Sequence, residues 1–209
     1  MNKITSIVAA LMLMPVMAHA QGAPEMVSYE ALPSGNYASD PTHTSLNWKL
    51  THMGMSHYTA RFTKVDATVT YNAKTPTTSK LVAIVDPTSI TTDYPVSKEH
   101  DFDRELQGEK WFDTAKFSTI KFESTKIDMT DKTHGKITGN LTFLGVTKPL
   151  VLDATFNGAI LQHPFTKKPA MGFSATAKLK RSDWGMGNYV PMIGDEVTLL
   201  IETELNKKD

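Results

Sequence analysis

Beyond Gly35, apolar and polar residues alternate along most of the chain. A period of two is typical of a β-strand that buries one face and leaves the other in water. Phe62 falls out of phase with the series that follows it, which indicates a bulge near Thr63. Because each series has one polar face, the strands are expected to form an antiparallel sheet that is wet on one side. The alternating series span residues 46–52, 65–71, 137–143, 150–160, 171–179 and 197–205.

Turn-forming segments separate these series, at residues 72–78, 131–135, 145–149 and 163–169. Long strands joined by short turns leave exposed sheet edges, and closure into a barrel removes those edges. The alternation stops between Pro95 and Thr114, where Ser97 could cap a helix. We therefore predict an all-β barrel with a short helical insertion around residues 97–112. The residues that could anchor this insertion against the sheet are Phe102, Leu106, Trp111 and Phe112.

The N-terminal residues have the form of an export signal. Lys3 supplies a positive charge, an apolar run follows over residues 7–17, and Ala18-His19-Ala20 has the small-x-small form of a cleavage site. The run is too short to span a bilayer, and no later segment is long enough either. We therefore predict a signal peptide over residues 1–20, cleaved near Ala20, a flexible tether over residues 21–34, and a barrel domain over residues 35–209.

The composition excludes several classes of protein. The 209 residues include 22 basic and 22 acidic side chains, so the chain carries no net charge. Nucleic-acid binding depends on a basic surface that releases counterions, and we therefore expect no nucleic-acid partner. Hydrophobic residues make up 40% of the chain, which is too many for a disordered protein. Cysteine is absent, which excludes disulfides, thiol nucleophiles and cysteine-ligated metals.

The series that would face the inside of the barrel combine small residues, such as Gly139 and Ala154, with aromatic ones. This pattern allows two interpretations: a hollow lumen, or a filled barrel in which small residues let the wall taper. A hollow lumen would be lined by hydrocarbon and would bind a long apolar chain at about 0.8 kcal/mol per methylene. The residues expected to line it are Leu46, Trp48, Leu50, Leu141, Phe143, Phe156, Phe173, Ala175, Ala177, Leu179, Leu199 and Ile201.

Residues suited to catalysis or metal binding are sparse. The histidines beyond residue 20 do not have the spacing of a zinc site, and there is no Gly-x-Ser-x-Gly elbow. His43, in Asp40-Pro41-Thr42-His43, either serves a turn or contacts a ligand head group. Arg181-Ser182-Asp183-Trp184-Gly185 is either a structural corner or a polar rim at the barrel mouth. We predict no catalytic residue, no metal and no cofactor. The candidates for a polar mouth are His43, His52, Arg181 and Asp183.

Several separated motifs occur in one order along the chain. They are Asp40-Pro41-Thr42-His43-Thr44, His52-Met53-Gly54, Gly145-Val146-Thr147-Lys148-Pro149 and Arg181-Ser182-Asp183-Trp184-Gly185. In this order, between about Tyr37 and Leu205, they resemble the YceI family of exported polyisoprenoid-binding proteins. Two positions depart from the family pattern, because Thr44 stands where Ser is usual and Ala60 begins a segment where Gly-x-Phe is usual.

The resemblance implies a lipocalin-like, eight-stranded antiparallel barrel whose apolar lumen holds an isoprenoid chain. It also implies a periplasmic protein without catalytic residues, and a membrane cytochrome of the b561 type as a candidate partner. The leading hypothesis is therefore a periplasmic carrier for a polyprenyl or similar apolar chain, such as a quinone, a polyprenyl phosphate, a fatty acid or an amide.

Two alternatives stay open. The first is a periplasmic enzyme that acts on an apolar substrate, for which His43, His52 and Asp183 would have to meet around one cavity. The second is a filled barrel that serves as an interaction module, with the helix around Phe102 and Trp111 contacting a partner. A lumen without any cavity would favour the second alternative.

Overall fold

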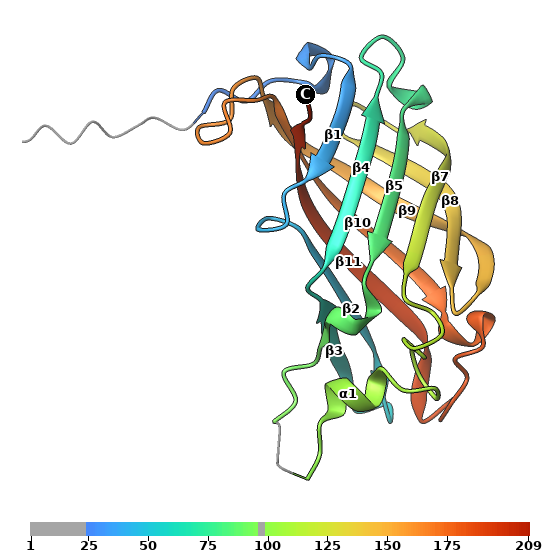
Figure 1. Cartoon of the computed structure of the whole chain (residues 1–209). Coiled ribbons are helices and arrows are strands. Elements are labelled where there is room, and N and C mark those ends of the chain that lie inside the picture. The colour runs from blue at the N-terminus through green and yellow to red at the C-terminus, as the bar shows by residue number, and fades with distance from the viewer. Residues whose placement is uncertain (1–23, 96–98) are drawn as a thin grey trace, which may run out of the picture.

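The computed structural model describes residues 24–95 and 99–209. Within these residues, eleven antiparallel strands form one sheet, which closes on itself because β1 pairs with β11 (Figure 1). The strands are β1 (Gly35–Ser39), β2 (Ser45–His52), β3 (Ser56–Phe62), β4 (Val65–Tyr71), β5 (Lys80–Val85), β6 (Ile90–Thr91), β7 (Ile120–Met129), β8 (His134–Phe143), β9 (Val146–Ile160), β10 (Ala170–Lys180) and β11 (Ile193–Lys207).

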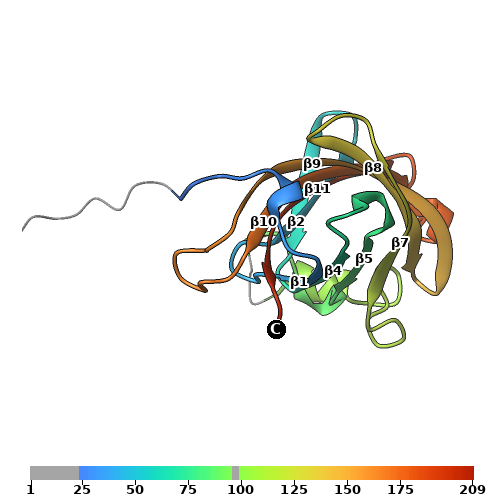
Figure 2. The same cartoon turned by 90° about the horizontal axis from the view of Figure 1, so that it is seen from above.

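Three strands of the barrel are each interrupted and count as two segments, so that the eleven segments form eight barrel strands. β1 and β2 both pair with β11 and are two parts of one kinked strand. β3 and β4 are the two parts of the next barrel strand. The third interrupted strand consists of β6, which pairs with β3, and β5, which pairs with β4. The break between Phe62 and Val65 lies where the sequence predicts a bulge. Viewed from above, the barrel strands are arranged in a ring (Figure 2). The predicted eight-stranded antiparallel barrel is thereby confirmed.

The helical insertion closes one end of this barrel. Helix α1 (Phe102–Leu106) is shorter than the predicted 97–112 segment, and the carboxylate of Asp101 caps it by accepting from the backbone N–H of Arg104 at 3.0 Å. The cap proposed at Ser97 lies outside the described residues. Leu106 is buried, and Trp111 is half-buried against the same core. The insertion therefore packs on the sheet through the apolar residues that the sequence indicates.

Residues 24–34 differ from the loose tether that the sequence predicts over 21–34. The N–H of Val27 donates to the carbonyl of Ala159 at 2.7 Å, and Leu32 is 1% exposed in a cluster with Tyr37 and Leu205. A short 3-10 turn, η1 (Tyr29–Ala31), lies over the end of the barrel opposite α1. Burial of Val27 and Leu32 explains why this segment packs. The predicted signal peptide and its cleavage site lie outside the described residues.

A bulge also changes which residues of β9 face inward. Gly172 pairs with Gly158, whereas Phe173 pairs with Phe156, so β9 has one extra residue between these two pairs. Beyond the bulge Ala159 becomes the buried residue, and Gly158 instead lies under the side chain of Met26. The inward series predicted through residue 160 therefore ends at Phe156.

Candidate functional site

The barrel encloses a cavity of about 330 Å³. All eight barrel strands contribute to its lining, which consists almost entirely of hydrocarbon. Known ligand pockets occupy about 300–1,000 Å³, so the space is sufficient for one apolar ligand. Water gains few hydrogen bonds from such a wall, and an apolar occupant is therefore favoured.

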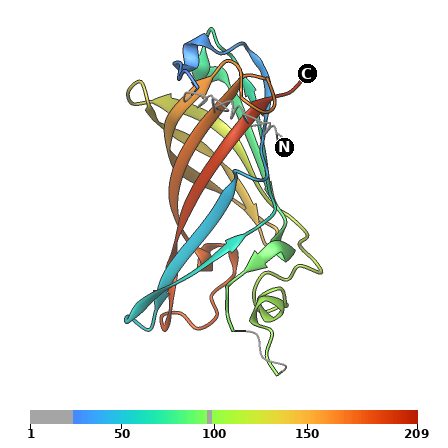
Figure 3. The ribbon, with the colours of Figure 1, turned by 90° about the vertical axis from the view of Figure 1, so that its left-hand side faces the viewer.

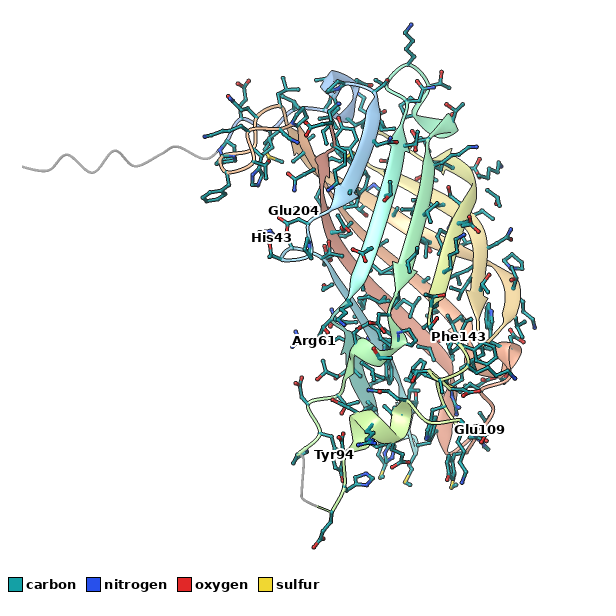
Figure 4. The ribbon with its side chains drawn as sticks, in the orientation of Figure 1. His43, Arg61, Tyr94, Glu109, Phe143 and Glu204 are labelled. Atoms are coloured by element: carbon teal, nitrogen blue, oxygen red, sulfur yellow. The ribbon has the colours of Figure 1, made fainter. Side chains whose placement is uncertain are left out.

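The predicted lumen residues lie on this cavity, with one exception. Every residue of that set except Ala177 is part of the lining. Ala177 is 5% exposed and packs in a core cluster that includes Trp184. Phe143 lies toward the α1 end (Figure 4), whereas Ala154 and Ala175 form a cross-strand pair farther from α1. The side chains of this pair fill little of the lumen, so the cavity has free space next to β9 and β10.

Aromatic and aliphatic side chains close the cavity at the α1 end. The ring of Phe112 meets the ring of Phe62 edge to face at 5.4 Å and lies 5.9 Å from the ring of Phe143. Leu106 and Met186, both buried, complete this floor. The floor is supplied largely by the insertion and by the connection between β10 and β11, so the sheet itself does not seal the barrel.

The opposite end is partly covered by Tyr29 of η1, whose ring packs on Phe156 at 5.6 Å, and it stays open beside the start of β5. The lining residues that are exposed to solvent are Lys80, Met129, Thr133 and His134, and all four lie at this end. They come from the start of β5 and from the hairpin between β7 and β8. These residues define the rim of the opening.

The pairing of β5 with β7 explains why the opening lies there. The two strands pair from Val82 to Val85 of β5, opposite residues 120–123. The N–H of Leu81 then donates to the hydroxyl of Ser124 at 2.8 Å, and the ladder ends. Among the described residues, no strand pairs with the rest of β7 up to Met129 on the β5 side, where the short turn η2 (Pro76–Thr78) contacts it instead. The pairing of β7 with β8 also shifts in register between Ser124 and residue 126. The rim could not be predicted from the sequence because neither strand has a clean period of two.

The candidates for a polar mouth do not meet at this rim. His43 lies on the outside of the barrel beside Glu204, at 3.9 Å, and also pairs with Asp40 at 3.1 Å (Figure 4). The hydrogen bond to Asp40 and the charge of Glu204 raise the pKa of His43 above its ordinary value. Hydrogen bonds from the Thr42 side chain, and then from His43, lower the pKa of Asp40 to about 2. This cluster stabilises the connection between β1 and β2.

Arg181 is a structural residue at the closed end. Its side chain is 2% exposed and donates to the backbone carbonyls of Gly194, Met186, Asn188 and Ile193 at 2.8–2.9 Å. Burial lowers the pKa of the guanidinium, although the charge of Asp195 opposes this effect. With these carbonyl partners, the guanidinium holds the 185–194 connection in place, as the corner interpretation of the motif predicts.

Arg181 is part of the cavity lining at the closed end, whereas His52 and Asp183 lie apart from the lumen. His52 is the last residue of β2 and pairs with Ile193 across the sheet. Asp183 is exposed in the short turn η4 (Arg181–Trp184), with its carboxylate 3.7 Å from the ammonium group of Lys148. Because His43, His52 and Asp183 are dispersed, the enzyme alternative that depends on them has no common site in this fold.

His134, a rim residue that the sequence analysis did not select, belongs to a second copy of the His43 turn. Asp131-Lys132-Thr133-His134 has the same Asp-x-Thr-His order as residues 40–43. The carboxylate of Asp131 accepts from the backbone N–H groups of Thr133 and His134 at 2.8 Å, and these bonds hold its pKa well below the usual range. The repeated tetrapeptide was the available signal for this turn, although it does not reveal that His134 borders the cavity.

Polar chemistry inside the lumen is limited. The indole N–H of Trp48 is buried without a hydrogen-bond partner among the described residues. In the same part of the chain, no group of three or more His, Cys, Asp or Glu side chains is placed to hold a metal ion. No helix within it is long and apolar enough to cross a membrane.

A closed eight-stranded barrel with an apolar cavity that opens at one end defines the class of lipocalin-like ligand-binding barrels. The model of the YceI-like domain matches residues 37–205, and the chain belongs to the YceI family. A UPF0312 protein of Vibrio parahaemolyticus is 33% identical over 175 residues, which cover 78% of this chain and 88% of that protein.

Two solved structures are similar to the barrel. A YceI protein of Campylobacter jejuni is 28% identical, with a TM-score of 0.64 over 76% of this chain and 90% of that chain. A polyisoprenoid binding domain from Saccharophagus degradans has a TM-score of 0.58 at 15% identity, over 82% of this chain and 98% of that domain. The second likeness concerns the fold alone.

Proposed function

We propose that this protein is a non-catalytic carrier that encloses a polyisoprenoid or a similar long apolar chain in its lumen. The observation that carries the proposal is the hydrocarbon-lined cavity of about 330 Å³, open at one end and closed by aromatic rings at the other. The fold shared with a domain described as polyisoprenoid-binding gives further support. The lumen would take a quinone, polyprenyl phosphate, fatty acid or amide through the same apolar tail.

Burial of the tail supplies the affinity. At about 0.8 kcal/mol per carbon, twenty buried carbons would contribute about 16 kcal/mol. Association costs about 4–15 kcal/mol, so a tail of this length is needed for tight binding, and a tail half as long would bind weakly or not at all. Because the wall offers few polar atoms, the protein would select the tail by its length and shape.

The head group would then lie at the rim formed by Lys80, Met129, Thr133 and His134. The aromatic floor around Phe112 blocks passage at the other end. The tail would therefore enter first and point toward the floor.

Export is part of the same proposal. The predicted signal peptide over residues 1–20 would place the mature protein in the periplasm, where it would carry its lipid between membranes or to a membrane cytochrome of the b561 type. N-terminal sequencing of the periplasmic protein tests the first part, with Gln21 expected at the terminus. Co-purification with such a cytochrome from detergent-solubilised membranes tests the second.

Native mass spectrometry tests the lipid-binding function directly. Protein purified from its host without delipidation is expected to carry an apolar adduct, and delipidated protein is expected to take up an added long-chain prenyl alcohol. A clean ligand-free mass together with no uptake of the added lipid would contradict the proposal. The empty volume of the lumen is the observation that argues against the filled-barrel alternative.

A further inference from the structure

Exposed apolar side chains gather at the same end of the barrel as the opening. Phe165, in the connection between β9 and β10, is 88% exposed, and Leu161 in the same connection is 48% exposed. Met26 is 60% exposed and packs over Gly158, and Val27 bridges to Ala159 at the end of β9. Figure 3 shows the β9–β10 connection and the C terminus together at this end, away from α1. We call the surface formed by Met26, Leu161, Phe165, Lys167, Lys168, Lys207 and Lys208 the docking end.

Basic charge accompanies these apolar residues. The N–H of Lys207 donates to the carbonyl of Pro169 at 2.9 Å, so the end of β11 lies beside the β9–β10 connection. Lys167 and Lys168 follow Phe165 in the same connection, and Lys207 and Lys208 lie at the end of β11, where the Lys207 side chain extends over Gly35. Lys168 pairs with Asp209 at 2.8 Å. Lys167, Lys207 and Lys208 form no ion pair within the described part of the chain. The docking end thus combines a protruding aromatic ring with four lysines, which outnumber the neighbouring carboxylates of Glu25 and Asp209.

The opposite end of the barrel is a contrasting surface. It exposes Met53, Met55, Tyr189 and Met192, each at least half exposed, but residues 53–56 and 185–192 contain no charged side chain. The cavity is also closed at that end. An anionic surface would therefore find more positive charge at the docking end than at the methionine-rich end, where Lys110 lies beside Asn188.

We propose that the docking end binds an anionic phospholipid bilayer, an inference that rests on the lipid-carrier function proposed above. Phe165 would insert at the boundary between head groups and acyl chains, where aromatic rings are favoured. The lysines would attract the anionic head groups, an effect that falls off within a Debye length. Because the cavity opens at this end, an apolar tail could leave the bilayer near the rim instead of crossing a long stretch of water.

Vesicle sedimentation of the purified protein tests this surface. Binding is expected to vesicles that contain phosphatidylglycerol, and much less to vesicles of phosphatidylcholine alone. Either Phe165→Ser or the double substitution Lys167→Glu with Lys208→Glu is expected to weaken that binding by roughly tenfold or more. Met53→Ser with Met55→Ser is the matched control, because it removes exposed apolar side chains at the other end and is expected to change nothing.

Three outcomes would overturn the proposal: no binding to either vesicle, equal binding to both, or loss of binding in the methionine variant instead of the Phe165 variant. Uptake of a prenyl alcohol from detergent micelles separates this result from a failure of the carrier function. Phe165→Ser is expected to load from micelles like the unaltered protein and to load more slowly from anionic vesicles. If the unaltered protein binds vesicles but takes up no lipid from micelles, the carrier function fails while the bilayer-binding surface stands.

Discussion

Filling the lumen from Ala175 offers a direct test of the cavity. Ala175 lines the cavity on β10, opposite Ala154 of β9 and Ile201 of β11. Ala175→Phe would place a ring in empty space without altering the outer surface. Two neighbours provide matched controls on the same strand, since Ala177 is buried in packed core and Thr176 is exposed on the outer face.

The expected magnitude follows from the volume that the ring removes. A benzyl group occupies roughly the space of one five-carbon prenyl unit, and burial of that unit contributes about 4 kcal/mol at about 0.8 kcal/mol per carbon. Losing all of this energy would raise the dissociation constant about a thousandfold. If the tail shifts and recovers part of the energy, the dissociation constant would still rise about tenfold. Because the ring of Ala175→Phe enters a void, we expect the free energy of unfolding to stay the same or to rise.

The assay combines ligand titration with urea unfolding. Trp48 and Trp111 both line the cavity, so quenching of intrinsic fluorescence by a prenyl quinone reports on binding. Ala177→Phe is expected to overpack the core and cost about 1–3 kcal/mol, and Thr176→Phe is expected to change both quantities little. If Ala175→Phe lowers stability as much as Ala177→Phe does, the space is not available to a ligand and the reasoning is refuted.

Three further predictions concern the wall. Burial raises the pKa of Tyr37 from 10.0 to about 12, so its stabilising effect is complete below about pH 10 and is lost as the pH rises toward 12. That loss amounts to about 3 kcal/mol, and Tyr37→Phe is expected to flatten this part of the urea stability curve. Arg181→Met leaves four backbone carbonyl groups, one buried and three partly buried, without this donor and is expected to lower the free energy of unfolding by about 3 kcal/mol or more. Gly139→Ala brings a methyl group into contact with both the Phe122 ring and the carbonyl oxygen of Glu123, and it is expected to lower the free energy of unfolding by about 1–3 kcal/mol. Gly172→Ala, with no atom of another segment nearer than 3.8 Å, is expected to be neutral.

Each of these has a contrary outcome. An alkaline stability curve that is identical with and without the Tyr37 hydroxyl would show that its ionisation is not linked to folding. Loss of lipid binding by Arg181→Met at full stability would return Arg181 to the polar mouth. Equal effects of the two glycine substitutions would mean that both the Phe122 ring and the Glu123 backbone can move aside at little cost.

The alternating pattern predicted the barrel but not all of its strands. β5 carries apolar residues on both faces, since Val85 is buried and Ile84 is 41% exposed, so no period of two is visible there. In β7 the register shift after Ser124 moves the pattern out of phase halfway along the strand. Both strands border the opening. The features that create the opening are therefore the same ones that hide its strands from a periodicity argument.

The small inward residues turned out to serve three different purposes. Gly139 admits the ring of Phe122 and so belongs to a filled part of the wall, Gly158 lies under Met26 beyond the bulge, and Ala154 and Ala175 face empty space. Composition alone could not separate these cases, because each depends on a partner from another strand. The four carbonyl groups around Arg181 were equally hidden, since backbone acceptors leave no mark in the sequence.

The distribution of rings along the axis determines how a ligand would lie. Aromatic residues line both halves of the lumen. Trp48, Phe62, Phe112 and Phe143 surround the floor, and Tyr29, Tyr71, Phe156 and Phe173 line the other half, which also carries the small residues Ala154 and Ala175. The rings of the floor pack on one another, edge to face at 5.4 Å for Phe62 and Phe112. The floor therefore fixes the position of the tail's inner end, whereas the length of tail that fills the other half of the lumen can vary. This arrangement favours tolerance toward head groups, which remain near the solvent, and a sharp dependence of affinity on the number of buried carbons.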